Sequence, residues 1–196
     1  MSLETLMQLK TRQAQRRDEC IAAGVLPDPN RPGLLEDAAK LVGTCMDMCP
    51  EYERVEREVQ KELDRWEVVP GTTHADPTAA VKIYRRPAAG RELPLPEDVR
   101  PPAVLEKTLN YLFHTLLPSD PRDPLFAAVQ PFLWNRTRAI RQDFIVQSDR
   151  GRTAIACHER IARYHILCLH WKGGVGADAW SCLLYTSPSP RDGLLS

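Results

Sequence analysis

Cysteine and histidine side chains are the groups in this sequence best suited to metal binding or nucleophilic catalysis. Cys45 and Cys49 are separated by three residues, and Cys157 directly precedes His158. A structural zinc site needs four ligands, and no second well-spaced pair accompanies Cys45 and Cys49. Adjacent residues on a helix point about 100° apart, so Cys157 and His158 do not converge as a nucleophile and its base. We therefore expect buried thiols, no metal, no cofactor and no enzymatic activity.

Arginine dominates the segment FLWNRTRAIRQDFIVQ, residues 132–147. Spacings of three and four place its side chains on two neighbouring helical stripes. The first stripe, expected to be buried, consists of Leu133, Thr137, Ile140 and Phe144, and the second consists of Trp134, Arg138, Arg141 and Ile145. Arg138 and Arg141 are therefore expected to flank the core instead of pointing into open solvent.

Two interpretations of these arginines stay open. Residues 132–163 contain seven arginines against three acids, whereas residues 51–65 contain six acids against four bases. Helices of opposite charge can complement each other, and arginine suits partly buried bidentate pairs. The alternative is a basic ridge that binds phosphates. We favour the paired interpretation, because a charged amphipathic helix is most often a solvated or paired face.

The composition limits the classes of function. The 196 residues carry 26 basic and 26 acidic side chains, so a globally basic coat for nucleic acid is excluded. No apolar run is long enough to cross a membrane, and the N-terminus lacks the apolar core of a secretory signal. Six irregularly spaced cysteines favour reduced thiols in the cytosol or nucleus.

The periodicity of apolar residues predicts a mainly helical chain. Helices are expected over residues 3–22, 33–43, 50–66, 102–117, 127–148 and 152–171, and AAVKIYRR, residues 79–86, is expected to form at most two turns. No segment alternates as a strand does. We therefore predict an all-α fold of stacked antiparallel helices, broken by Pro-rich connections.

Three regions are expected along the chain. Residues 1–42 form an N-terminal helical extension and residues 43–171 form the main domain. Residues 172–196 lose the helical pattern, and CLLYTSPSPRD within them resembles translated cloning-adaptor sequence. We expect this tail to be non-native and the chain to be a fragment.

Five sequence blocks, in order, resemble the SAC/GANP family. They are GTCMDMCPEYERVERE, AVKIYRRPAAGRE, VRPPAVLEKTLNYL, FLWNRTRAIRQDFIVQ and ACHERIARYHILCLH, spanning about residues 43–170. The residues that carry the motifs are expected to be structural: Gly43, Thr44, Cys45, Asp47, Met48, Cys49, Pro50, Glu51, Trp134, Arg136, Arg138, Arg141, Gln142 and Asp143. Met46 stands where the family usually has proline.

The resemblance implies a non-enzymatic scaffold of helical-repeat, PCI-associated type. Its members include the large subunit of the complex at the nuclear pore that couples transcription to mRNA export. The resemblance also implies a PCI-domain partner, a small acidic subunit and residence in the nucleus, at the pore, with the cytoplasm as an alternative. The family domain ends in a winged helix, which we expect to be missing here. Neither a membrane nor a small-molecule substrate is expected.

Two further functions remain as alternatives. One is direct RNA binding through Lys82, Arg85 and Arg86 together with the arginine ridge. The other is a centrosomal or mitotic role within the same family, which a shared domain cannot separate from mRNA export. For the scaffold interpretation, GTCMDMCPE is expected to be a rigid connector with Thr44 as a helix cap. Arg136, Arg138, Arg141 and Asp143 would tie this connector to its neighbours, and replacing Arg141 with alanine would lower thermal stability.

Overall fold

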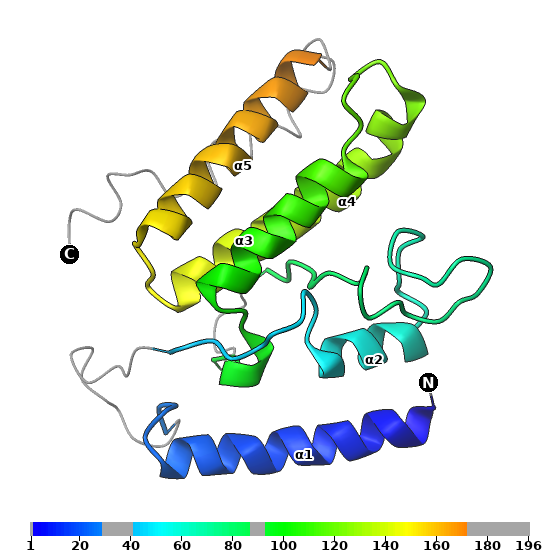
Figure 1. Ribbon diagram of the computed structural model, residues 1–196. Helices are drawn as coiled ribbons and strands as arrows, with labels where there is room; N and C mark the ends of the chain where they lie inside the picture. The colour runs from blue at the N-terminus through cyan, green and yellow to red at the C-terminus, as the bar shows by residue number, and fades with distance from the viewer. Residues whose placement is uncertain (1, 29–40, 87–92, 172–196) are drawn as a thin grey trace. The chain divides into compact units, whose positions relative to one another are not determined.

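The computed structural model describes residues 2–28, 41–86 and 93–171, and these contain five α-helices and no β-strand (Figure 1). The helices are α1 (Leu3–Ala22), α2 (Glu51–Val59), α3 (Pro102–Tyr111), α4 (Pro124–Val146) and α5 (Arg152–Trp171). A 3-10 helix, η2 (Pro96–Asp98), precedes α3, and a π-helical segment, η3 (Leu112–Leu116), continues it. The predicted all-α class is confirmed for this part of the chain, whereas the stacked helical-repeat arrangement stays a prediction.

The chain divides into two compact units, residues 1–157 and residues 158–196. Helix α5 begins in the first unit and continues into the second. Every group of the candidate site described below lies in the first unit.

Local sequence signals explain where the helices begin and end. The side chains of Ser2 and Asp123 cap α1 and α4 by accepting hydrogen bonds from Thr5 N and Leu125 N. At its C-terminal end, α2 closes in a Schellman motif: Lys61 N donates to Glu58 O and Glu62 N donates to Arg57 O. Lys61 takes the left-handed conformation that this motif requires, with φ 58°.

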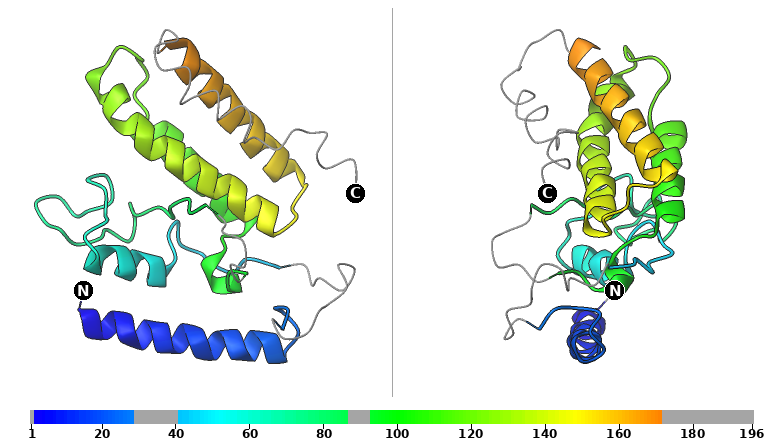
Figure 2. Two further views of the ribbon diagram at one scale, coloured as in Figure 1. Left: turned by 180° about the vertical axis from the view of Figure 1, so that it is seen from behind. Right: turned by 90° about the vertical axis from the view of Figure 1, so that its left-hand side faces the viewer.

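Two helix pairs build the first unit. Helices α1 and α2 lie side by side, and Leu6 and Leu9 of α1 pack with Val55 of α2 (Figures 1 and 2). Helices α3 and α4 form the second pair. The predicted buried stripe of α4 is confirmed, because Leu133, Thr137, Ile140 and Phe144 are all buried. In the neighbouring stripe, Trp134, Arg138 and Arg141 are partly buried, but Ile145 is exposed.

Three predicted features need correction or lie outside the described residues. The helix expected over 50–66 ends at Val59, because the Schellman turn reverses the chain and brings Glu67 back to Arg57. Residues 81–86 are not helical, because their backbone groups bond to other segments and not to each other. Most of the helix expected over 33–43 and the whole tail, 172–196, lie outside the described residues.

The connector, residues 43–50, is hydrogen-bonded to η2, to Val99 and to the C-cap of α4, and Thr44 does not cap α2; the rigidity of the connector stays a prediction. Thr44 N donates to Pro96 O at 2.8 Å and Cys45 N donates to Val99 O at 3.0 Å. Gly43 N donates to Gln147 Oε1 of the α4 C-cap at 3.0 Å. Gly43 is buried here, so the connector needs its small size and not its flexibility.

Replacing Gly43 with alanine is expected to lower the free energy of unfolding by about 2 kcal/mol, a typical cost of overpacking. A Cβ at position 43 would lie 2.5 Å from Val99 O and 2.8 Å from Val99 C, and these are backbone atoms that cannot rotate away. Urea unfolding followed by circular dichroism measures the effect. Gly151→Ala is the control, because its Cβ would meet only the flexible Asp149 side chain. Equal stability of the two variants would contradict the close approach.

Candidate functional site

A buried ionic cluster joins α2, the following loop and α4 through Glu67. Arg57 Nη1 donates to Glu67 Oε1 at 3.1 Å, and Arg57 Nη2 bonds to Glu67 Oε2. Arg136 Nη2 of α4 donates to the same Oε2 at 2.9 Å. Backbone N–H groups of Asp64 and Val81 also donate to this carboxylate. One carboxylate therefore fixes three separate stretches of chain.

This Glu67 cluster is almost completely removed from water. Glu67 and Arg57 have no exposed surface, and Arg136 is 6% exposed. Burial by itself raises the pKa of Glu67, but the charges of Arg136 and Arg57 and the hydrogen bonds outweigh it and hold the pKa below its ordinary value. The carboxylate is therefore ionised at neutral pH, and its role is to neutralise two buried guanidinium groups.

A second buried cluster joins the connector to α4 through Asp143. Arg100 Nε donates to Asp143 Oδ2 at 2.8 Å, and Lys82 Nζ donates to Asp143 Oδ1 at 2.7 Å. Arg100 Nη1 also donates to Met48 O of the connector at 3.2 Å. Gln147 Nε2 donates to the carbonyl oxygens of Arg100 and Asp143. The connector is therefore held by Arg100 and Gln147, which lie within the family-like sequence blocks but were not among the motif residues expected to be structural.

Residues 82–85 run between α2 and α4 and are bonded to both. Lys82 N donates to Met48 O, and Ile83 N donates to Glu53 Oε1 at 2.7 Å. Tyr84 N donates to Asn135 Oδ1 at 3.0 Å. Gln142 Nε2 donates to the carbonyl oxygen of residue 85 at 3.2 Å. This stretch is not helical, because the N–H groups of residues 82–84 and the carbonyl groups of residues 84 and 85 bond to other elements instead of to each other.

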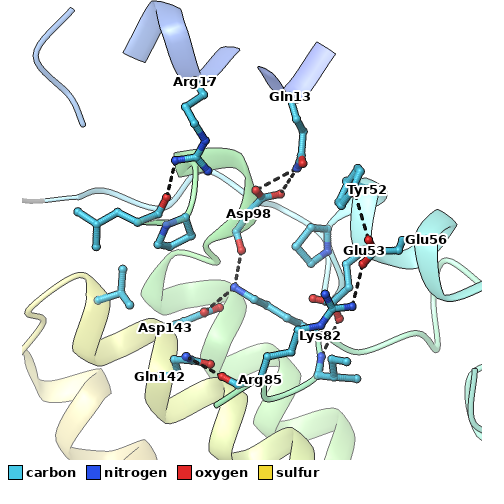
Figure 3. Close-up of a pocket in the computed structure, with 15 residues that line it drawn as sticks. Gln13, Arg17, Tyr52, Glu53, Glu56, Lys82, Arg85, Asp98, Gln142 and Asp143 are labelled. Atoms are coloured by element: carbon cyan, nitrogen blue, oxygen red, sulfur yellow. Dashed lines mark hydrogen bonds and ion pairs between the residues drawn. The ribbon is translucent and has the colours of Figure 1, made fainter. Parts of the chain in front are cut away.

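A cavity of about 340 Å³ lies where these elements meet (Figure 3). Its lining comes from α1, α2, residues 82–85, residues 93–98 and α4. Among the lining residues, Gln13 Nε2 donates to both carboxylate oxygens of Asp98, at 3.1 Å each. Burial raises the pKa of Asp98 to about 6, and the neighbouring Glu97 and Glu53 act in the same direction against Lys82. Charges of both signs line the cavity, so its chemistry does not select one class of small ligand.

The three arginines of α4 that were predicted to hold the connector differ in the contacts that they make. Arg136 is tied, but to Glu67 and not to the connector. Arg138 forms no ion pair among the described residues; its guanidinium carbon stacks 3.9 Å from the Tyr84 ring centroid and 5.9 Å from that of Trp134. Arg141 is partly buried, and its side chain forms no ion pair or hydrogen bond with another described residue. The expected loss of stability in Arg141→Ala therefore has no contact to support it.

The charge complementarity expected between residues 51–65 and residues 132–163 is not what the described glutamates of α2 show. The glutamates of α2 bond elsewhere: Glu51 to Arg12, Glu53 to Ile83 N, Glu56 to Arg85 and Glu58 to His74 and Ala75 N. The acid that neutralises an α4 arginine is Glu67, beyond α2. An arginine of α4, Arg136, does form an ion pair inside the fold, but its partner Glu67 comes from the loop after α2.

The three residues predicted to contact RNA lie in different environments. Lys82 is bound to Asp143 and to the carbonyl oxygen of Asp98. Arg85 Nη2 donates to Glu56 Oε2 at 2.8 Å. Arg86 alone of the three is exposed. RNA contact stays a prediction, and two of these three cations already neutralise acids of the protein itself.

The remaining motif residues lie in or beside the connector. Asp47 accepts a hydrogen bond from Arg54 Nη1 at 3.3 Å, and Glu51 starts α2 after Pro50. Cys45 and Cys49 are buried, and burial raises the pKa of both thiols, which makes them poor nucleophiles at neutral pH. Within the described ranges, no three His, Cys, Asp or Glu side chains converge on a metal position. None of the helices in these ranges is long and apolar enough to cross a membrane.

Sequence reasoning missed Glu67, Arg57, Arg100 and Gln147 as the centres of the two clusters. Helical spacing alone would pair Arg57 with Glu53, four residues earlier, but that pair is long at 3.8 Å. Glu67 and Arg100 lie in Pro-rich, non-periodic segments, where spacing carries no information about burial. Only the position of Gln147 could have been used to predict its role. A polar residue directly after a helix can donate a hydrogen bond to a carbonyl group of the last helical turn.

Comparison with known proteins gives one consistent result. A sequence model of the SAC3/GANP family matches residues 48–182. The chain is 50% identical over 163 residues to SAC3 family protein 1 of Schizosaccharomyces pombe, which covers 83% of this chain and 16% of that protein. It is 37% identical over 153 residues to SAC3 family protein B of Arabidopsis thaliana, covering 78% of this chain and 8% of that protein. It is 38% identical over 130 residues to Protein xmas of Drosophila melanogaster, covering 64% of this chain and 6% of that protein.

Proposed function

The chain belongs to the SAC3/GANP family, and we propose that it is part of a non-enzymatic scaffold subunit in a nuclear mRNA-export complex. The observation that carries the proposal is the family match over residues 48–182. The chain spans less than a fifth of the length of each relative described above, so the function of a whole protein is part of the proposal.

The two buried clusters support a scaffold role. Glu67 and Asp143 each bind two cationic side chains and, between them, connect α2, the connector, residues 81–82, Arg100 and α4. Buried ion pairs lose most of their Coulomb gain to desolvation, so they contribute geometry more than net stability. A fixed relation between non-adjacent segments is what a subunit needs if it is to present a constant surface to its partners.

The partners that we propose are a PCI-domain protein and a small acidic subunit. Co-expression of the three proteins, followed by size-exclusion chromatography, tests this assembly. We expect one complex that persists at about 0.5 M salt, because a packed interface depends little on screened surface charges. Separate elution of this chain from both partners at low and high salt would contradict the proposal.

The cellular role is tested by depleting the protein that carries this sequence and imaging polyadenylated RNA. Accumulation of this RNA in the nucleus is the expected result, and re-expression of the unaltered protein should reverse it. A normal RNA distribution combined with centrosome or spindle defects would instead assign the protein to the mitotic alternative within the same family.

A further inference from the structure

Helix α4 carries positive charge that the described residues around it do not neutralise. Its sequence contains three arginines and a single acid, Asp143. Asp143 is already bound to Arg100 and Lys82, and Arg136 is bound to Glu67. Arg138 and Arg141 remain, and neither forms an ion pair with a carboxylate of the described residues.

The two arginines are close enough to repel each other. They lie three residues apart on one helix, which places them on the same face. Burial lowers the pKa of Arg141, and the charge of Arg138 lowers it further. A bound anion between the two guanidinium groups would remove this repulsion, and the fold offers no carboxylate of its own from the described residues.

An aromatic platform fixes the orientation of Arg138. The guanidinium stacks on Tyr84 at 3.9 Å, with Trp134 on its own helix at 5.9 Å. Tyr84 is held in turn by two hydrogen bonds to Asn135, from Tyr84 N to Oδ1 at 3.0 Å and from Nδ2 to Tyr84 O at 3.4 Å. Stacking covers the face of a guanidinium and leaves its N–H edge to donate, which is the geometry for bidentate binding of an oxyanion.

We propose that Arg138 and Arg141, with Tyr84 and Trp134, form a binding site for the phosphate backbone of single-stranded RNA. We name these four residues the arginine–aromatic site. Guanidinium groups beside partly exposed aromatic rings are the combination that single-stranded nucleic acids use, with phosphates on the cations and bases on the rings. An acidic peptide would use the charges but leave the rings without a role. The site does not depend on the proposed scaffold function.

The test measures the affinity of the full chain for a fluorescent oligouridylate of about 15 nucleotides, by anisotropy, over a series of salt concentrations. The test variant is Arg138→Gln combined with Arg141→Gln. The control variant is Arg122→Gln combined with Arg163→Gln. It removes the same charge from two exposed arginines, which within the described part of the chain pair only with near neighbours in sequence. Thermal unfolding of all three proteins is followed by circular dichroism.

We expect the test variant to bind RNA at least about tenfold more weakly at low salt. The slope of log affinity against log salt should also fall by about 1.4, since each phosphate contact to a single strand contributes roughly 0.7. The control variant should keep the affinity within about twofold and should keep the slope. The test variant should unfold within about 4 °C of the unaltered chain, because it loses the stacking of Arg138 on Tyr84 but no ion pair within the described residues.

Two results would overturn the proposal. In the first, the unaltered chain and the test variant bind the oligouridylate equally, or neither binds it at all. In the second, a glutamate-rich peptide binds the unaltered chain and loses affinity in the test variant, while RNA binding is unchanged in both. The second result would assign the site to an acidic protein partner.

Discussion

Replacing Glu67 with glutamine is expected to lower the free energy of unfolding by about 3–5 kcal/mol, the usual cost of removing one partner from a buried ion pair. The substitution keeps the size of the side chain but leaves Arg136 buried with no ion pair among the described residues, and leaves Arg57 with only its long 3.8 Å pair to Glu53. Domains of this size are stable by about 5–15 kcal/mol, so a large part of the stability would be lost. Urea unfolding followed by circular dichroism measures the change.

The pH dependence separates an electrostatic cause from a packing cause. The pKa of Glu67 is lower in the folded chain than its ordinary value of 4.5. Its contribution to stability is therefore complete above about pH 4.5 and is lost as the pH falls through the lower, folded value. Glu67→Gln should be much less stable than the unaltered chain at pH 7, and the difference should shrink in acid.

Glu159→Gln is the matched control for Glu67→Gln. Glu159 pairs with Arg163 at 2.8 Å, but both side chains are more than half exposed. Such pairs contribute at most about 0.5 kcal/mol on a helix surface, so we expect almost no change. If Glu67→Gln costs less than about 1 kcal/mol, or costs the same at about pH 3 as at pH 7, the buried cluster does not have the role described here. If the variant fails to fold, Glu67→Met combined with Arg57→Met and Arg136→Met should restore folding, because an apolar replacement needs no counter-charge.

The sequence predicts the helices much better than it predicts the site. Helix α5 has the expected bounds, 152–171, and the buried stripe of α4 follows from spacing alone, because apolar period and helical period coincide there. The site depends instead on contacts between distant segments, such as Glu67 with Arg136, 69 residues apart. No local sequence pattern predicts such a pair. Of its two members, only Arg136 lies in one of the family-like sequence blocks.

The fate of the α4 arginines illustrates the same limit. Spacing places Arg136, Arg138 and Arg141 on or beside the buried face, and this is confirmed. It does not show that one binds a carboxylate, one stacks on an aromatic ring and one keeps its charge unpaired among the described residues. These differences depend on Glu67 and Tyr84, which lie in Pro-rich segments where periodicity gives no information.

Replacing Asp143 with asparagine is expected to cost about 3–4 kcal/mol of unfolding free energy and to release the connector. Arg100 is fully buried and Lys82 is largely buried, so both would lose their counter-charge. Arg100 also holds Met48 O, and Met48 O accepts from Lys82 N. The rate of amide hydrogen exchange should therefore rise at Lys82 and Cys45 by more than the global loss of stability accounts for. In Glu67→Gln, by contrast, the exchange rate should rise first at Val81, whose N–H donates to Glu67.

A double-mutant cycle of Asp143→Asn and Arg100→Gln decides whether the connector is held by this ion pair or by packing around it. Once Asp143 is neutral, removing the charge of Arg100 relieves an unpaired buried cation, so the second substitution should cost less in the variant than in the unaltered chain. We expect a coupling free energy of about 1–3 kcal/mol, measured by urea unfolding. Costs that add to within about 0.5 kcal/mol would mean that the two side chains act independently. The hydrogen bonds from Gly43 to Gln147 and from Cys45 to Val99 would then be what holds residues 43–50 in place.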